Sequence, residues 1–138
     1  MSTLSDATLR SILQTVKTIA VVGASDKKQR PVYGVMQFLQ QRGYRCIPVN
    51  PRLAGEQLLG EMVYANLTDI TEPVDMVDVF RRSEEVQPIA DAAIEIGAKV
   101  LWMQLGVVNQ AAADHATSAG LKVVMNRCPA IEIPRLGI

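Results

Sequence analysis

The sequence predicts an α/β fold: a single doubly wound, mostly parallel five-stranded sheet with helices on both faces. Two observations support this prediction. Short apolar runs rich in β-branched residues alternate with segments in which apolar residues recur at helical spacing. The first such run, Ile19-Ala20-Val21-Val22, is apolar at every position, which fits a central strand that is covered on both sides. Alternating strands and helices joined by short loops are typical of this class.

The chain length is consistent with one domain. A chain of 138 residues is long enough for one well-packed core and too short for two ordinary domains. With 49% hydrophobic and 20% charged residues, the composition is that of a folded globular protein. No repeat or linker divides the chain, so we expect one domain over 1–138, with an N-terminal helix in 1–17 and a C-terminal tail over 130–138.

The first half of the chain shows clear start and stop signals. Ser5 and Asp6 precede an amphipathic pattern, which predicts a helix over 5–16. A strand follows over 18–23. Pro31, a residue favoured at the first helical position, predicts a helix that runs to about residue 42 and ends at Gly43.

The middle of the chain is less regular. Residues 45–49 form a second apolar run, but Pro48 lacks a backbone donor, so we expect this strand to be bent or locally unpaired there. We interpret 51–60 as a loop. Residues 62–70 are compatible with either a helical turn or a short connection.

Three more strands and two more helices follow. The apolar runs predict strands over 74–80, 99–103 and 121–125. Ser83, followed by two acidic residues, is the expected N-cap of the helix that ends at Gly97. Asn109 is the expected cap of an alanine-rich helix that ends at Gly120.

Composition argues against several function classes. Fourteen basic residues balance 14 acidic ones, and aromatic residues make up 4% of the chain, so we expect neither a nucleic-acid nor a membrane partner. The N-terminus lacks the pattern of a signal peptide, and no apolar run has the length of a membrane span, which favours a cytoplasmic protein. Two separated cysteines and one histidine do not suggest a metal site.

Half of the basic residues follow strands, although the chain carries no net charge. In a parallel sheet these positions converge on the carboxyl edge, where ligands bind in open α/β folds. The small residues Gly23-Ala24-Ser25 followed by a helix start at Pro31 form an arrangement that presents backbone N–H groups to a phosphate. We therefore expect a ligand with several phosphates. The basic residues concerned are Lys27, Lys28, Arg30, Arg52, Arg81, Arg82 and Arg127.

Motifs narrow the choice of nucleotide. The G-x-G-x-x-G fingerprint is absent, because the next glycine after Gly23 is Gly34. The end of the second strand carries Val49-Asn50-Pro51 instead of the acidic residue that holds an adenosine ribose, which disfavours NAD. The Walker pattern is also missing. NADP and coenzyme A (CoA) both remain compatible with the basic edge.

Five motifs in order resemble a known family, the YccU-type bacterial CoA-binding proteins. This family is similar in fold to the N-terminal CoA-binding domain of the succinyl-CoA synthetase alpha subunit. The resemblance implies a Rossmann-like domain that holds CoA or an acyl-CoA at the carboxyl edge. The motifs are Val21-Val22-Gly23-Ala24-Ser25, Val49-Asn50-Pro51, Val77-Asp78-Val79-Phe80-Arg81, Leu101-Trp102-Met103-Gln104-Leu105-Gly106 and Val124-Met125-Asn126-Arg127-Cys128-Pro129.

The resemblance also implies roles for individual residues. The Gly23-Ala24-Ser25 turn would hold the CoA phosphates through backbone N–H groups and a hydroxyl, and Asn50-Pro51 would flank the adenosine end. Phe80-Arg81 would line the groove, and Gln104-Leu105-Gly106 would face the pantetheine arm. With the basic edge, the expected binding residues are Gly23, Ala24, Ser25, Lys27, Lys28, Arg30, Pro31, Asn50, Pro51, Arg52, Phe80, Arg81, Gln104, Leu105 and Gly106.

No set of residues forms a self-sufficient catalytic group, so we predict a non-catalytic carrier or sensor. His115 fits a solvated surface position, and Asp75 and Asp78 point to opposite faces of a strand. Cys128 beside Arg127 is either a buried, inert thiol, which we favour, or a reactive thiolate. The alternatives are an NADP-dependent oxidoreductase or epimerase and a CoA-site subunit of a larger acyl-CoA-handling complex. A protein partner or a homo-oligomer is compatible with the sequence.

Overall fold

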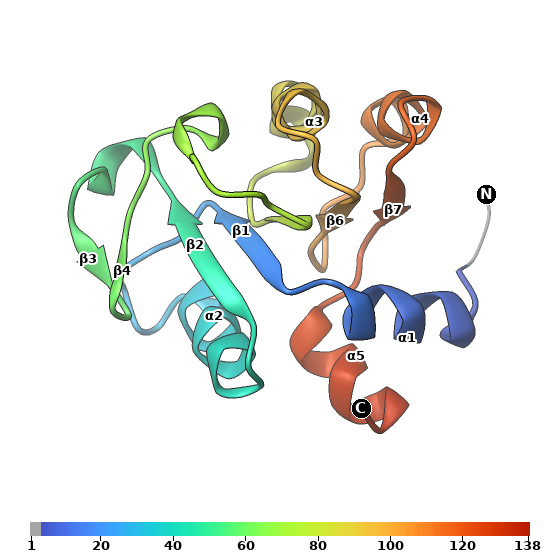
Figure 1. Ribbon diagram of the computed structural model, residues 1–138, viewed down its shortest axis with the longest axis horizontal. Helices are drawn as coiled ribbons and strands as arrows, with labels where there is room; N and C mark the ends of the chain where they lie inside the picture. The colour runs from blue at the N-terminus through green and yellow to red at the C-terminus, as the bar shows by residue number, and fades with distance from the viewer. Residues whose placement is uncertain (1–3) are drawn as a thin grey trace.

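The computed structural model describes residues 4–138, and its centre is a five-stranded sheet in the order β2-β1-β5-β6-β7. All neighbouring strands in this sheet pair in parallel. The predicted α/β fold class with a five-stranded sheet is therefore confirmed (Figure 1). The strands are β1 (Thr18–Val22), β2 (Arg45–Val49), β5 (Met76–Val79), β6 (Val100–Met103) and β7 (Lys122–Val124).

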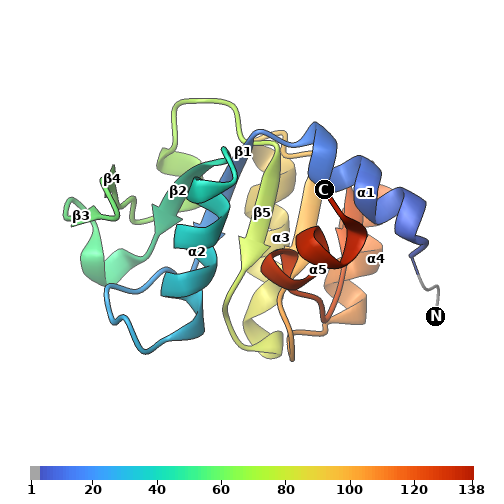
Figure 2. The ribbon, with the colours of Figure 1, turned by 90° about the horizontal axis from the view of Figure 1, so that it is seen from below.

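Helices cover both faces of the sheet, as Figures 1 and 2 show. Helices α1 (Asp6–Thr15), α2 (Pro31–Gln41) and α5 (Pro129–Leu136) lie on one face. Helices α3 (Val86–Glu95) and α4 (Gln110–Ser118) lie on the other. Alternate residues of β1 supply the two cores. Ile19 and Val21 belong to the cluster of the first face, and Ala20 and Val22 belong to that of the second. The sheet thus separates two apolar layers.

Most predicted helix starts agree with the structure. The Oγ of Ser5 accepts a hydrogen bond from the N–H of Thr8 at 3.1 Å, and Pro31 is the first residue of α2. The side chain of Asn109 caps α4. The prediction for Ser83 is wrong, because α3 begins at Val86 after a 3₁₀ turn, η3 (Ser83–Glu85). The Ser83 hydroxyl bonds instead to the loop after β6, which brings two exit loops together.

Strand β2 is continuous through Pro48, contrary to the expected interruption. Pro48 lies in register with Val21 of β1. Its carbonyl accepts from the N–H of Tyr64 at 3.0 Å on the side away from β1. The missing N–H of the proline therefore also faces outward, where the ladder with β1 does not need it. The residues around Tyr64 cover this edge of the sheet through a bridge to Val49.

The segment after β2 contains a hairpin that the sequence did not predict. Strands β3 (Gln57–Leu58) and β4 (Glu61–Met62) pair in antiparallel fashion across Leu59-Gly60. Both turn residues have positive φ, 50° at Leu59 and 82° at Gly60. An Asn-Gly pair would have predicted a turn with such angles, whereas a Leu-Gly pair does not. Two 3₁₀ turns, η1 (Pro51–Leu53) and η2 (Leu67–Asp69), flank the hairpin, so the helical-turn alternative for 62–70 was correct at 67–69.

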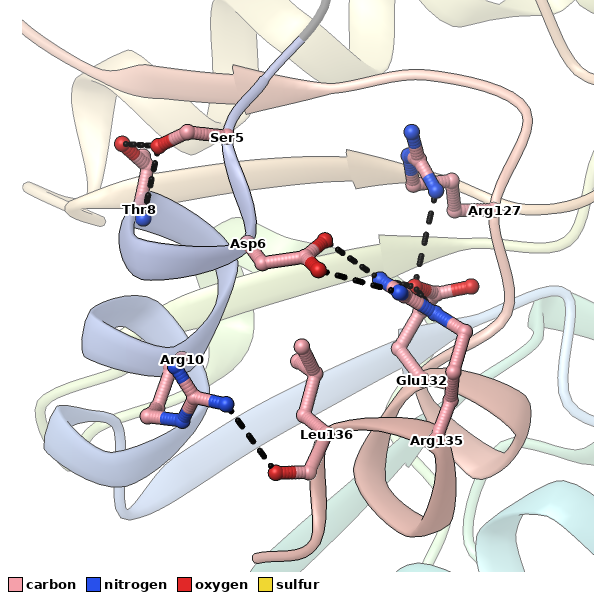
Figure 3. A network of polar contacts seen from close by, with 8 residues as sticks. All are labelled: Ser5, Asp6, Thr8, Arg10, Arg127, Glu132, Arg135 and Leu136. Carbon is pink, nitrogen blue, oxygen red and sulfur yellow. Dashed lines mark hydrogen bonds and ion pairs between the residues drawn. The ribbon is translucent and has the colours of Figure 1, made fainter.

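The C-terminal segment over 130–138, expected only as a tail, lies mostly in a helix, α5 (Pro129–Leu136). Helix α5 packs against α1 and α2. A chain of opposite charges joins it to α1: Asp6 pairs with Arg135 at 2.9 Å, and Arg135 pairs with the buried Glu132 at 2.6 Å (Figure 3). Glu132 also pairs with Arg127, just beyond β7, at 3.4 Å. These contacts join both ends of the described chain to the segment that follows β7.

Candidate functional site

A cleft of about 690 Å³ lies at the carboxyl ends of β1, β2 and β5. The chain leaves β1 toward β2 on one side and β5 lies on the other, so the cleft occupies the topological switch point of the sheet. Its size is within the usual range for small-molecule sites. The lining residues are Gly23, Ala24, Ser25, Asp26, Lys27, Arg30, Asn50, Pro51, Arg52, Leu53, Phe80, Arg81, Arg82 and Glu85.

Gly23 allows two exit loops to approach each other at the base of the cleft. Its φ is +89°, a conformation that L side chains rarely adopt. A Cβ at this position would lie 2.5 Å from the carbonyl oxygen of Phe80 and 3.0 Å from the Cδ of Arg81. The Arg81 side chain thus passes directly over the glycine turn. Only glycine fits this crossing of the β1 and β5 exits.

The hydrogen bonds of the turn correct one part of the sequence interpretation. The N–H groups of Gly23 and Ala24 both donate to the carbonyl of Val49, at 3.0 and 3.3 Å, so they are not directed at a ligand. The side-chain amide of Asn50 donates to the Ala24 carbonyl at 2.7 Å and fixes the turn from the β2 side. The Ser25 hydroxyl accepts from the N–H of Lys27 at 3.1 Å. Phosphate donors must therefore come from beyond Ala24.

The cleft carries five basic and two acidic side chains. Lys27, Arg30 and Arg52 form no ion pair with any residue in 4–138. Arg81 and Arg82 both pair with the carboxylate of Glu85, at 2.6 and 2.9 Å. The hydrogen bonds from these two guanidinium groups lower the pKa of Glu85. The unpaired positive charge is thus concentrated on the β1 and β2 side.

The structure brings together ten of the predicted binding residues and leaves five outside the cleft lining. Lys28 and Pro31 are exposed but do not line the cleft. Gln104 is buried, Leu105 is 56% exposed, and the N–H of Gly106 donates to the Asn126 side chain at 2.7 Å. Arg127 is also absent from the cleft. The ten lining residues are Gly23, Ala24, Ser25, Lys27, Arg30, Asn50, Pro51, Arg52, Phe80 and Arg81.

The Gln104 side chain faces the protein interior, because its hydrogen-bond partner, Asp78, is buried there. With its amide nitrogen turned toward the fully buried carboxylate, Gln104 donates to both oxygens of Asp78, at 3.0 and 3.2 Å. Burial raises the pKa of Asp78 well above its usual value. Both residues come from neighbouring strand ends, and alternation along a strand does not reveal that a polar side chain is paired in the core. Gln104 is therefore a core residue behind the carboxyl edge.

Four cleft residues were absent from the predicted binding set: Asp26, Leu53, Arg82 and Glu85. Arg82 belongs to the predicted basic edge, and the exit of β5 places it in the lining. The acidic residues after Ser83 are expected at a helix start, whereas the carboxylate of Glu85 lies between two arginines. The i, i+3 and i, i+4 spacings to Arg82 and Arg81 are the signal that would have revealed this cluster.

The residues considered for catalysis lie elsewhere. His115 is exposed on α4 and its Nε2 lies 3.1 Å from the carboxylate of Asp91 on α3. Cys128 is buried at the start of α5 and does not line the cleft. Over residues 4–138 no group of three potential ligands is placed to hold a metal ion. None of the helices within the same residues combines the length and apolarity that a bilayer crossing requires.

The comparisons with known proteins agree with this geometry. The chain is 40% identical to the uncharacterized protein YneT of Bacillus subtilis (strain 168) over 124 residues, 90% of each chain. A hypothetical protein of Pyrococcus horikoshii OT3 has a similar structure, with a TM-score of 0.93 and 39% identity over 98% of this chain and 94% of its own. Another similar structure, cell-free ID.343 from Thermus thermophilus, has a TM-score of 0.92 and 38% identity over 96% and 99%.

A family assignment follows from the sequence match. Residues 17–134 match the model of the CoA binding domain family, and this range includes the whole sheet and every residue of the cleft. The resemblance seen in the five sequence motifs is thereby confirmed. The chain belongs to the CoA binding domain family.

Proposed function

We propose that this protein binds CoA or an acyl-CoA in the switch-point cleft and acts as a non-catalytic cytoplasmic carrier or sensor. The observation that carries the proposal is the concentration of five basic side chains around the glycine turn, at the place where open α/β sheets bind nucleotides. Family membership favours CoA over other ligands with several phosphates.

The uneven charge of the cleft suggests how CoA would lie in it. The side chains of Lys27, Arg30 and Arg52 form no ion pair within residues 4–138, so the phosphorylated end of CoA would bind on the β1 and β2 side. The N-terminus of α2, which follows Arg30, adds its positive dipole end there. Leu53 and Phe80 supply apolar surface in the same cleft. The uncharged pantetheine arm would then extend past Arg81, whose charge Glu85 already balances.

A titration with one matched pair of variants tests this proposal. Lys27 lines the cleft and its neighbour Lys28 does not, although both are exposed lysines on the same loop. We expect micromolar binding of CoA by calorimetry. Lys27→Ala weakens it about fivefold, the effect of losing about 1 kcal/mol from one exposed charge contact, and Lys28→Ala changes it less than about twofold.

Titrations with related ligands distinguish CoA binding from NADP binding. Dephospho-CoA lacks the 3′-phosphate and should bind more weakly than CoA, with a smaller dependence on salt. NADP carries an extra phosphate near its ribose and tests the oxidoreductase alternative. Tight binding of NADP without any response to CoA would overturn the proposal. Equal losses in the two lysine variants would show that the ligand binds outside the cleft.

A further inference from the structure

A second cavity of about 420 Å³ lies beside β7, the edge strand farthest from β2. Val123 and Met125 line it from the strand side, and Ala113 and Thr117 line it from α4. Val108, a 46% exposed residue of the loop between β6 and α4, stands at its rim. We call this cavity the β7 groove. The role proposed for the first cleft does not use it.

Hydrogen bonds join the loop that borders the cleft to the loop that borders the β7 groove. Arg82 lines the cleft, and the hydroxyl of the next residue, Ser83, accepts a hydrogen bond at 2.9 Å from the N–H of Val108. The side-chain amide of Asn109 donates to the Ser83 carbonyl, also at 2.9 Å. The exit loop of β5 and the loop after β6 are therefore bound together.

The loop after β6 presents an exposed apolar side chain and is held by a hydrogen bond to a residue that follows β7. Leu105, 56% exposed, lies on the loop after β6. The N–H of the following Gly106 is bonded to the side chain of Asn126, a residue that lines the groove. Three strand spacings separate β1 from β7, about 14 Å. An extended pantetheine arm is of comparable length, so a ligand with its phosphates beside β1 would carry its thiol past the loop after β6 to the β7 groove.

The charges around the β7 groove indicate what kind of group fits it. Arg127 lines the groove, but it ends the alternating chain Asp6–Arg135–Glu132–Arg127 (Figure 3), whose formal charges cancel. The other charged lining residue is Asp114, whose carboxylate accepts a hydrogen bond from Gln110 at 2.8 Å. A carboxylate entering the groove would meet Asp114, and Arg127, the one cation among the described lining residues, already pairs with Glu132. An uncharged chain suits this environment.

We infer that the β7 groove receives the acyl chain of an uncharged, medium-chain acyl-CoA whose phosphates occupy the cleft. This inference rests on the proposed function and names the class of acyl group that the site prefers. The chain passes over Leu105 and enters beside Val108. Burial of its methylene groups against Val123, Met125 and Ala113 supplies the preference over free CoA.

Calorimetric titration of the full chain with CoA, acetyl-CoA, hexanoyl-CoA and succinyl-CoA tests the inference. We expect hexanoyl-CoA to bind about tenfold more tightly than CoA, from the burial of several methylene groups. Acetyl-CoA should gain little, and succinyl-CoA should bind no better than CoA. Val108→Glu should remove the hexanoyl preference, measured as the ratio of hexanoyl-CoA affinity to CoA affinity. Ile131, 51% exposed on α5 and outside both cavities, provides the matched control Ile131→Glu, which should retain the preference.

The possible results separate the two proposals. If the wild-type protein binds none of the four ligands, the proposed function fails and the inference fails with it. If it binds CoA and hexanoyl-CoA equally, the proposed function stands and the inference is overturned. A hexanoyl preference that survives in Val108→Glu, or a stronger preference for succinyl-CoA, also overturns it. A circular dichroism spectrum equal to that of the wild type verifies that each variant is folded.

Discussion

Replacing Gly23 by alanine should destabilise the protein far more than the same replacement at a second glycine of similar backbone conformation. Gly23 has φ +89° and Gly120, just after α4, has φ +97°. The strain of placing a side chain at positive φ is therefore shared, about 1–2 kcal/mol at each position. The two sites differ in what the new methyl group meets. At Gly120 nothing lies within 4 Å, apart from its two chain neighbours.

At Gly23 the new Cβ would lie 2.5 Å from a backbone oxygen, that of Phe80. The backbone at this point cannot yield freely, because the N–H of Phe80 donates to the carbonyl of Val22 at 2.8 Å. Overpacking of this kind costs about 1–3 kcal/mol beyond the backbone strain. We therefore expect Gly23→Ala to lower the free energy of unfolding by about 2–5 kcal/mol and Gly120→Ala by about 1–2 kcal/mol.

Urea denaturation of the wild type and both variants measures the difference, provided that the slopes of free energy against urea agree. The variants need no ligand for this comparison, so the result does not depend on the proposed function. If Gly23→Ala were no more destabilising than Gly120→Ala, the close approach of the β1 and β5 exits would be refuted.

Two further predictions concern carboxylates. Glu85→Gln should raise CoA affinity a few-fold at low salt, because Arg81 and Arg82 no longer share an internal anion. The control Glu84→Gln, outside the cleft, should not change CoA affinity. Weaker CoA binding in Glu85→Gln would mean that the carboxylate positions the two arginines instead. Burial raises the pKa of Asp78 in the folded protein above its unfolded value, so its contribution to stability is complete below the unfolded pKa and is lost as pH rises toward the folded pKa. Asp78→Asn should therefore gain stability relative to the wild type as pH rises from about 4, by up to about 1.4 kcal/mol for each pH unit in that window. Urea titrations of both proteins across pH measure this gain. A difference in unfolding free energy between the two proteins that stays constant with pH would contradict the burial effect.

The fold was predictable because local signals and the global arrangement agree. The apolar run before Gly23 fits a strand that is covered on both sides, and Ser5, Pro31 and Asn109 mark helix starts by capping chemistry that acts within a few residues. The sequence predictions fail where contacts between residues far apart in the chain determine the local backbone conformation. Leu59 adopts φ 50° in the β3–β4 turn, a conformation that its side chain does not favour. Its carbonyl accepts a hydrogen bond from Gln40 on α2, a contact that no short window of sequence contains.

The candidate site was predictable in location but not in the orientation of its groups. Parallel topology alone brings Lys27, Arg52 and Arg81 to one edge, so the cleft could be anticipated. Whether a group faces the ligand depends on what else it can bond. The N–H of Gly23 is directed to Val49, and Gln104 turns inward to Asp78. Such pairings join residues far apart in the sequence, and the type of residue does not specify them.

A crystal structure of the protein grown with CoA tests directly whether CoA binds in the switch-point cleft. We expect the CoA phosphates in the switch-point cleft, within hydrogen-bond distance of Lys27, Arg30 or Arg52, with the pantetheine arm running past Arg81 toward Leu105. CoA bound at another surface, or an empty cleft under conditions in which calorimetry shows saturation, would contradict it.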